Sequence, residues 1–400
     1  MEILNRKDYC LSCEHILEEK GAIFAPTTTY IAEPTNLITK YCKHCGQKIE
    51  ENIEQIKTDF NTFKTALSNR KLKVVAYVAP SVRAGIGEYF NITQDCQHKI
   101  VTALKMLGCY SVFSMNFGAD LTITEESKEL TERLKSNTNL PLLTSCCPAW
   151  INYVYKVYPQ LKPNLSTCKS PQQMMGAIIN NYYTQVNNYD ASDIFVVSIV
   201  PCLAKKLERV RDGINSTSGH DVDACVTTVE LASLIKQKGI DFINLPDTPF
   251  DSLFEKYSGS ASAFGVAGGV SNAVIYNIDS SAKLVNQEFG DVVSKTFLVN
   301  GQEIHVAQVE GLANTKNIIN NILNNNCKYH LVEVMACTGG CIGGAGQPKS
   351  TDLQPRKDIL NISKNTSKIA QAKNNTIINN LYKTYLTPKL SKKLLHENRK

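Results

Sequence analysis

Three separate segments of the chain carry cysteines within a few residues of the end of an apolar run. The cysteines of these segments, in chain order, are Cys146 and Cys147, then Cys202, then Cys337 and Cys341. In open α/β sheets, ligands collect outside the carboxyl ends of the strands. Three distant segments that deliver thiols to equivalent places therefore predict one shared site.

The number and setting of these thiols favour a cluster over a single ion. One thiolate from each of the first two segments and both from the third give four ligands, the number that a cubane iron–sulfur cluster requires. A four-cysteine zinc site usually takes its ligands as two close pairs, which these segments do not offer. Glycines at 339, 340, 343, 344 and 346 surround Cys341 and let backbone approach a bulky object closely.

The apolar runs alternate with stretches of helical length, which predicts an α/β domain with at least some parallel strands. The runs expected to form strands are Val74–Pro80, Ser111–Met115, Leu140–Leu143, Ile194–Val200 and Leu331–Met335. Residues 50–70 have apolar positions at helical spacing, and so do residues 360–400. A boundary is expected near residue 70.

Composition excludes several classes of protein. Fourteen cysteines in 400 residues are too sparse for a disulfide scaffold, and the first residues lack the apolar core of a signal peptide. No apolar run is long enough to span a membrane, so we expect a cytoplasmic protein without a membrane partner. Residues 351–400 carry 11 lysines and arginines against 3 acidic residues, but nothing indicates nucleic-acid binding.

The first 45 residues contain two further cysteine pairs. These are Cys10 and Cys13, then Cys42 and Cys45, with 28 residues between the two pairs. Two C-x-x-C pairs predict a second metal site, which fits zinc, a rubredoxin-like iron or an iron–sulfur cluster. The KHCGQK turn favours zinc, whereas the need to bring electrons to a buried cluster favours a redox centre, so the metal stays open.

The motifs TSCCPAW, PCLAKKLE and EVMACTGGCIGGAGQP resemble the three H-cluster motifs of the iron-only (FeFe) hydrogenases. The similarity extends to APSVR, DLTITEE, LSTCKSPQQM, FGVAGGV and the tail NTIINNLYKTYLTPKLSKKLLH. It implies a two-lobed α/β catalytic domain at 70–350, with mixed and parallel sheets flanked by helices. Residues 1–69 would form a cysteine-rich metal module with a linker helix, and residues 351–400 a helical tail that resembles the family's small subunit.

By this resemblance, Cys147, Cys202, Cys337 and Cys341 hold a 4Fe–4S cubane. Cys341 also bridges to a two-iron subsite that carries carbon monoxide, cyanide and a dithiolate. The residues expected to line the site of this H-cluster are Ala79, Pro80, Ser81, Gln172, Pro201, Phe264 and Met335. Lys205 is expected to donate to a cyanide nitrogen.

The resemblance also implies a path for protons. Cys146 neighbours a ligand without being one, and its thiol is expected to pass protons to the bridging group as a general acid and base. The expected relay from there to the surface comprises Glu126, Ser166, Glu129 and Glu208. The remaining five cysteines receive no role beyond that of small core or surface thiols, and they are Cys96, Cys109, Cys168, Cys225 and Cys327.

The expected function is reversible reduction of protons to hydrogen with electrons from a ferredoxin-type donor, after dedicated maturation proteins have installed the H-cluster. Two alternatives are a hydrogenase-like assembly factor for iron–sulfur proteins, which lacks the two-iron subsite, and a sensory hydrogenase. The sequence departs from the family at Val200, where methionine is frequent, and at Ala345, where glycine is usual. Neither departure removes a ligand.

Overall fold

The structure is a computed structural model that describes residues 49–216 and 219–398, with side chains from Asp59 onward. Cys10, Cys13, Cys42 and Cys45 lie outside the described residues, so the second metal site stays a prediction. The division of the chain at residues 69 and 350 also stays a prediction.

The first of two sheets is wholly parallel, with the strand order β2-β1-β4-β5. Its strands are β1 (Lys73–Val78), β2 (Ser111–Ser114), β4 (Ile194–Val200) and β5 (Ala224–Thr227). Every residue of β4 is buried, as expected for a central strand covered on both faces. Apolar runs predicted three of these strands, while β5 was not among the predicted runs.

The second sheet is mixed, with the order β3-β9-β8-β7-β6. Its strands are β3 (Leu142–Leu143), β6 (Lys283–Glu288), β7 (Val292–Val299), β8 (Gln302–Glu310) and β9 (Leu331–Met335). The three strands β3, β9 and β8 run parallel, and β8, β7 and β6 follow each other in antiparallel register. The sequence predicted β3 and β9 but not β6, β7 and β8. Strand β6 is exposed at nearly every position and β7 is mostly half-buried, so neither forms a continuous apolar run.

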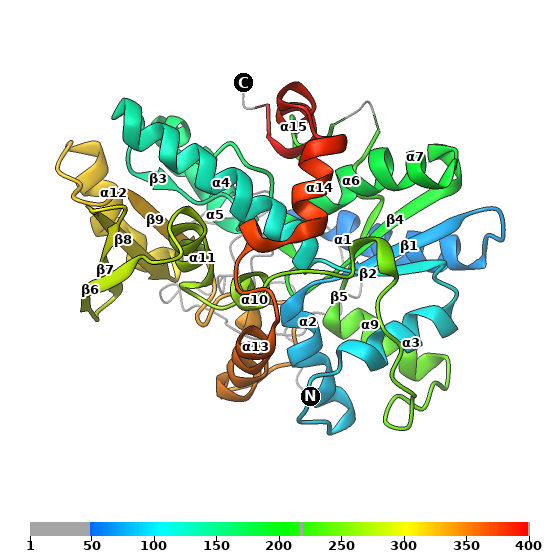
Figure 1. Cartoon of the computed structure of the whole chain (residues 1–400). Coiled ribbons are helices and arrows are strands. Elements are labelled where there is room, and N and C mark those ends of the chain that lie inside the picture. The colour runs from blue at the N-terminus through cyan, green and yellow to red at the C-terminus, as the bar shows by residue number, and fades with distance from the viewer. Residues whose placement is uncertain (1–48, 217–218, 399–400) are drawn as a thin grey trace.

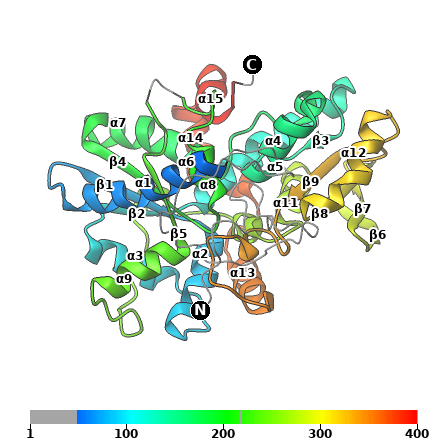
Figure 2. The ribbon, with the colours of Figure 1, turned by 180° about the vertical axis from the view of Figure 1, so that it is seen from behind.

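Helices flank both sheets, which lie at opposite ends of the molecule (Figures 1 and 2). The helices before residue 200 are α1 (Ile49–Ser68), α2 (Pro80–Gly85), α3 (Gln97–Leu107), α4 (Asn116–Ser136), α5 (Pro148–Val157), α6 (Pro171–Ile178) and α7 (Thr184–Asn187). Those after it are α8 (Ala204–Glu208), α9 (Thr228–Gln237), α10 (Gly259–Ser262), α11 (Gly269–Ile278), α12 (Lys316–Leu323), α13 (Gln354–Thr366), α14 (Thr376–Thr384) and α15 (Pro388–Leu395). The expected α/β class with parallel and mixed sheets is confirmed.

Helix α1 packs on the first sheet. Phe63 is fully buried in the same hydrophobic core as strands β1 and β4. Asp59 accepts a hydrogen bond from Nε of Arg209 at 3.0 Å, and both side chains are buried. This helix, expected as a linker, therefore contributes to the core of the first lobe.

The C-terminal helices lie over the junction between the lobes. In Figure 1, α14 and α15 run beside α4 and α6. After α15, the backbone of His396 forms an antiparallel bridge with Cys168, and the amide of Glu397 donates to the carbonyl of Thr167 at 2.8 Å. The tail is therefore tied by main-chain hydrogen bonds to the segment that precedes α6. Among the described helices, none has the length and apolar character needed to cross a membrane.

Candidate active site

The four expected ligand cysteines line one cavity. Cys147 caps the N-terminus of α5 just after β3, and Cys202 follows the end of β4 by two residues. Cys337 stands two residues beyond the end of β9, and Cys341 begins the next short helical turn. Both sheets thus deliver thiols from the carboxyl ends of their strands, as the sequence predicted.

All seven residues expected to line the cofactor site also border this cavity. The hydroxyl of Ser81 is buried there and has no hydrogen-bond partner among the described residues. Other residues without a role in the sequence analysis also border the cavity, among them Met115, Ala119, Gly265 and Ala336. They are apolar or lack a side chain, so neither charge nor spacing marked them.

The glycines after Cys341 allow a close approach, but mainly of one protein segment to another. A Cβ atom on Gly344 would lie 2.5 Å from the carbonyl oxygen of Pro201. The amide of Gly346 donates to that same oxygen at 2.7 Å. The loop after Cys341 is therefore pressed against the segment that carries Cys202, which holds ligands from both sheets close together.

Two other glycines shape the cavity itself. Gly340 has a φ of +80°, and a Cβ atom there would lie 2.7 Å from the amide nitrogen of Ala267. A Cβ atom on Gly265 would lie 2.2 Å from Oγ of Ser81 and 3.7 Å from Cβ of Cys341. A side chain at Gly340 would push against backbone and force these loops apart, whereas one at Gly265 would displace the hydroxyl of Ser81 from the cavity.

Lys205 is buried at the cavity and held in place at its head. Its Nζ donates to the carbonyl oxygen of Cys146 at 3.0 Å and pairs with Oε2 of Glu208 at 2.9 Å. Burial alone would lower the pKa of Lys205, but the Glu208 carboxylate outweighs it and raises that pKa. The ammonium therefore stays charged inside a largely apolar wall.

Glu208 belongs to this fixed network. Its Oε2 accepts hydrogen bonds from Oγ of Ser170 at 2.9 Å and from Nε2 of Gln172 at 3.1 Å, in addition to Lys205. Gln172 in turn accepts from Oγ of Ser198 at 2.9 Å. The structure thus joins Glu208 to Lys205 and Gln172, whereas it reports no bond from Glu208 to Glu126 or Glu129.

Cys146 lies on the cavity wall next to Cys147, one of the expected ligands. Burial, with the Glu126 carboxyl as the next largest influence, raises the pKa of the Cys146 thiol well above its usual value. This side chain is therefore a protonated thiol at neutral pH. Its position beside the ligands and its electrostatic coupling to Glu126 suit a group that passes protons.

Glu126 is fully buried on α4, and both of its carboxyl oxygens lack a hydrogen-bond partner among the described residues. Burial, reinforced by the nearby Glu129 carboxylate, raises the pKa of Glu126 to about 8. A carboxyl group with this pKa exchanges protons near neutral pH, as a relay requires.

Glu129, one helical turn further along α4, connects the interior to the surface. Its Oε2 accepts hydrogen bonds from Oγ of Ser166 at 3.0 Å and from Oγ1 of Thr167 at 3.2 Å. Its Oε1 pairs with Arg133 at 2.6 Å. Ser166 is buried, while Glu129 borders an open surface pocket of about 2320 Å³.

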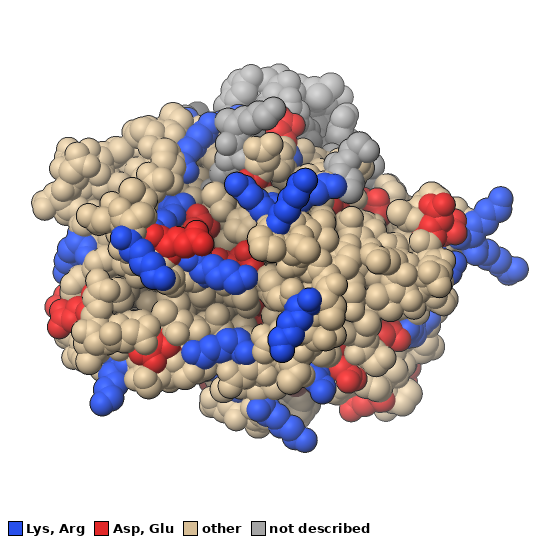
Figure 3. All heavy atoms as spheres, turned by 45° about the horizontal axis from the view of Figure 1, so that its top comes forward, with Lys and Arg blue, Asp and Glu red and all other residues tan. Residues whose placement is uncertain are grey.

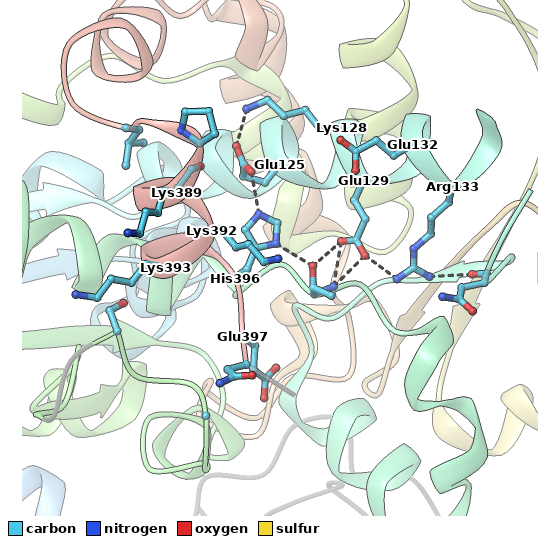
Figure 4. Close-up of a pocket in the computed structure, with 18 of the residues that line it drawn as sticks. Glu125, Lys128, Glu129, Glu132, Arg133, Lys389, Lys392, Lys393, His396 and Glu397 are labelled. Carbon is cyan, nitrogen blue, oxygen red and sulfur yellow. Dashed lines mark hydrogen bonds and ion pairs between the residues drawn. The ribbon is translucent and has the colours of Figure 1, made fainter. Parts of the chain in front are cut away.

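Figure 4 shows a chain of contacts that continues from Glu129 along this surface pocket. Oγ1 of Thr167 bonds to Nδ1 of His396 at 2.8 Å, and Nε2 of His396 bonds to Glu125 at 2.9 Å. Burial opposes ionisation of Glu125, but His396 and Lys128 together lower its pKa to about 2. The sequence analysis assigned no role to Glu125, Thr167 or His396.

The residues present fit an H-cluster. Four cysteines offer the soft donors that iron–sulfur clusters take, and all four border one largely apolar cavity. Lys205 supplies a buried cation and Ser81 an unpartnered hydroxyl, both suited to the nitrogen or oxygen atoms of small bound ligands. The donor set and its polar surroundings agree with the expected cofactor.

Comparisons with known proteins agree with this site. The family described as "Iron only hydrogenase large subunit, C-terminal domain" matches residues 72–345. The periplasmic [Fe] hydrogenase large subunit of Nitratidesulfovibrio vulgaris is 40% identical over 295 residues, which cover 70% of this chain and 70% of that protein. Iron hydrogenase 1 of Clostridium pasteurianum is 38% identical over 305 residues, covering 73% of this chain and 53% of that protein. This chain thus spans about half the length of the clostridial protein.

Solved structures and a second group of relatives complete the comparison. A variant of the [FeFe]-hydrogenase HydA1 from Chlamydomonas reinhardtii has a TM-score of 0.74 and 30% identity, over 86% of this chain and 98% of that one. The cytosolic iron-sulfur assembly component 3 of Bos taurus is 29% identical over 334 residues, covering 78% of this chain and 69% of that protein. The relatives therefore include hydrogenases and assembly factors, and on the family match and the fold together this chain belongs to the iron-only hydrogenase family.

Proposed function

We propose that this protein is an iron-only hydrogenase that reversibly reduces protons to molecular hydrogen. One observation carries the proposal: protonatable side chains lead from the thiol-lined cavity to the surface. In order they are Cys146, Glu126, Ser166 and Glu129. A protein that only carried a cluster as a scaffold would not need buried, proton-bearing groups at these places.

Cys147, Cys202, Cys337 and Cys341 would hold the H-cluster as a 4Fe–4S cubane joined to a two-iron subsite. When bound, this group supplies the metal centre at which electrons and protons combine. Lys205 would hold a cyanide nitrogen with its charged head, which Glu208 and the carbonyl of Cys146 already orient. The apolar walls formed by Phe264 and Met335 would exclude water.

The proton path uses groups matched to transfer near neutral pH. Glu129 takes a proton at the surface pocket and passes it through the hydroxyl of Ser166, with which it shares a 3.0 Å hydrogen bond. Glu126, with its pKa of about 8, accepts and releases that proton inside the fold. The Cys146 thiol then delivers a proton at the cavity wall.

An assembly factor for iron–sulfur proteins is the second candidate, because such proteins are among the relatives. It would use the same four cysteines for a cluster but would not need the two-iron subsite. The relay from Cys146 to Glu129 favours the enzyme. For the enzyme, we propose a ferredoxin-type electron donor and maturation proteins that install the two-iron subsite.

Infrared spectroscopy separates the two candidates. The full chain, supplied with the two-iron subsite, is expected to show cyanide and carbonyl stretching bands and to evolve hydrogen from a reduced low-potential donor. Protein with a 4Fe–4S signal but without these bands would support an assembly factor and overturn the proposal of a hydrogenase. The variant Lys205→Met is expected to shift the cyanide bands, because it removes the cation beside them.

A further inference from the structure

Three side chains that are typical metal ligands meet at the outer end of the relay, where two of them line the surface pocket and the third, a cysteine, is buried beside it. Glu129 comes from α4, Cys168 from the segment before α6, and His396 from the tail after α15. One ligand atom of each residue lies within 4.8 Å of those of the other two. Among the described residues, this group combines sulfur, nitrogen and oxygen donors at a single point.

We propose that Glu129, Cys168 and His396 form a binding site for a divalent zinc ion, and that zinc bound there blocks proton transfer through the relay. The binding itself does not depend on the proposed function. The regulatory consequence rests on it, since Glu129 is the outermost member of the proposed relay.

The donor set favours zinc over the hard cations. Zinc accepts thiolate, imidazole and carboxylate ligands together, whereas calcium and magnesium take oxygen atoms. Sγ of Cys168 already lies 3.5 Å from Oε2 of Glu129. Three protein ligands at an open pocket leave a fourth position for water, which completes a tetrahedral site.

His396 is held with one ring nitrogen directed at the group. Its Nε2 bonds to Glu125 at 2.9 Å, which leaves Nδ1 on the side of Thr167 and Glu129. Metal-ligating histidines commonly have a carboxylate on the other ring nitrogen, which fixes the orientation of the ring. The carboxyl group of Glu125 occupies this supporting position, because its Oε2 lies 2.9 Å from Nε2 of His396.

The backbone fixes the distance between the tail and the Cys168 segment. Residues Cys168 and His396 form an antiparallel bridge, flanked by the 2.8 Å hydrogen bond from the amide of Lys169 to the carbonyl of Leu395. Side chains opposite each other in such a bridge have closely spaced Cβ atoms. The two ligands are therefore brought together by main-chain pairing.

Binding would require modest local changes. The hydroxyl of Thr167 lies between Glu129 and His396 and would rotate away to release Nδ1. Arg133 could keep its 2.6 Å pair with Oε1 of Glu129 while the ion takes Oε2. Coordination deprotonates the Cys168 thiol and releases one proton to water in the pocket, so a carboxylate and a thiolate balance the charge of the ion.

Nearby lysines oppose the approach of a cation and limit the expected affinity. Lys389, Lys392 and Lys393 project around the pocket, and Figure 4 shows them beside His396. Figure 3 shows Lys and Arg side chains spread over this face, with acidic side chains gathered between some of them. The carboxylates of Glu125, Glu129 and Glu132 border the same pocket and offset this positive charge.

The proposed block of proton transfer follows from the hydrogen bond that Glu129 would lose. In the metal-free structure, its Oε2 accepts the hydrogen bond of Ser166. An ion on Oε2 removes the carboxylate as a proton acceptor and places a positive charge at the entrance of the relay. Zinc would therefore slow turnover without touching the cavity or its thiols.

The first test measures binding with cobalt(II) as a spectroscopic substitute for zinc. It uses the full chain after cluster insertion, so that the other cysteine sites are already filled. Wild-type protein is expected to show a thiolate-to-cobalt absorption band that Cys168→Ser lacks. The matched control Cys327→Ser, a half-buried cysteine elsewhere in the fold, is expected to keep the band. Identical cobalt spectra for wild type and Cys168→Ser would overturn the site.

The second test measures inhibition of hydrogen evolution by zinc, with each variant compared to its own metal-free rate. Glu125→Gln and His396→Ala are expected to need about 10- to 100-fold more zinc for the same inhibition. The control His98→Gln is expected to respond as wild type does, and a chelator should restore activity. Equal inhibition of all variants would overturn the proposal that zinc bound at this site blocks the relay. Protein without hydrogenase activity that keeps the Cys168-dependent cobalt band would support the site while contradicting the proposed function.

Discussion

Two buried carboxyl groups close to the cavity have very different surroundings. Glu208 accepts hydrogen bonds from Ser170, Gln172 and the ammonium of Lys205 on a single oxygen. Glu126 has no such partner on either oxygen among the described residues, and its pKa is raised to about 8. Both side chains are almost completely buried.

The difference indicates what each carboxyl group is for. Glu208 is fixed by these three hydrogen bonds, so it holds the head of Lys205 at the cavity. Glu126 pays a desolvation penalty when it ionises, so it readily keeps or returns a proton. A carboxyl group held by several hydrogen bonds positions its neighbours, whereas a buried carboxyl group with a pKa near neutrality can transfer protons.

The largest expected effect comes from breaking the proton path at its inner end. Cys146→Ala should retain the infrared bands of the loaded cofactor, because Cys146 is not among the four ligands. Its turnover should fall about 10²- to 10⁴-fold, the usual contribution of a positioned general acid or base. Hydrogen evolution assays on equally loaded protein check this. Wild-type turnover in this variant would remove Cys146 from the path.

Breaking the positioning pair should mainly cost stability. Lys205→Met leaves the Glu208 carboxylate buried without its cation, and the free energy of unfolding should fall by about 3–5 kcal/mol. The double variant Lys205→Met/Glu208→Leu should recover most of this loss, since no buried charge remains. Urea denaturation of the cluster-free chain provides the measurement. Equal stability of the single variant and wild type would contradict the described pairing.

Glu126 should make stability depend on pH. In the unfolded chain its carboxyl titrates near 4.5, and in the folded chain at about 8, so the folded state binds an extra proton between these values. Stability should therefore fall as the pH rises through this window, by no more than about 1.4 kcal/mol per pH unit, and this contribution should level off above it. Glu126→Gln should lose this component of the slope in denaturation at several pH values.

A neighbouring exposed carboxylate provides the control for that measurement. Glu132 lies on the same helix and is exposed, so Glu132→Gln should keep the wild-type pH dependence. A Glu126→Gln variant with the wild-type slope would mean that Glu126 ionises as an ordinary surface carboxylate does.

The smallest effect is expected at the outer rim of the relay. Lys128 pairs with Glu125 at 2.7 Å, but half of its side chain is exposed. Lys128→Ala should therefore change the free energy of unfolding by less than about 1 kcal/mol, and the effect should shrink further at high salt. If Lys128→Ala lowered the free energy of unfolding as much as Lys205→Met, the buried and the exposed ion pair would not differ in their contribution to stability.

The sequence predicted the parts of the fold in which burial is complete. The runs at β1, β4 and β9 are apolar because these strands are covered on both faces. Strand β6 is exposed at nearly every position, so its composition resembles that of a loop. The number of strands in the second sheet could therefore not be derived from hydrophobic patterns.

The sequence predicted those site residues that lie in recognisable motifs. It did not predict residues that only the folded structure brings together. The cavity residues lie in long motifs, so their positions followed from the resemblance. Lys205, by contrast, would pass for a surface lysine in the sequence AKKLE, and only the fold buries it. His396 and Glu125 meet across 271 residues, and nothing near either residue indicates the contact.

The delivery of thiols from both sheets has a thermodynamic consequence. Cys202 follows a strand of the first sheet, while Cys147 and Cys337 follow strands of the second, so a cluster bound by all of them would cross-link the two lobes. A ligand that binds the docked lobes but not the separated ones stabilises docking by mass action. Cluster occupancy and cooperativity of unfolding should therefore be linked, with the loaded protein melting as one unit.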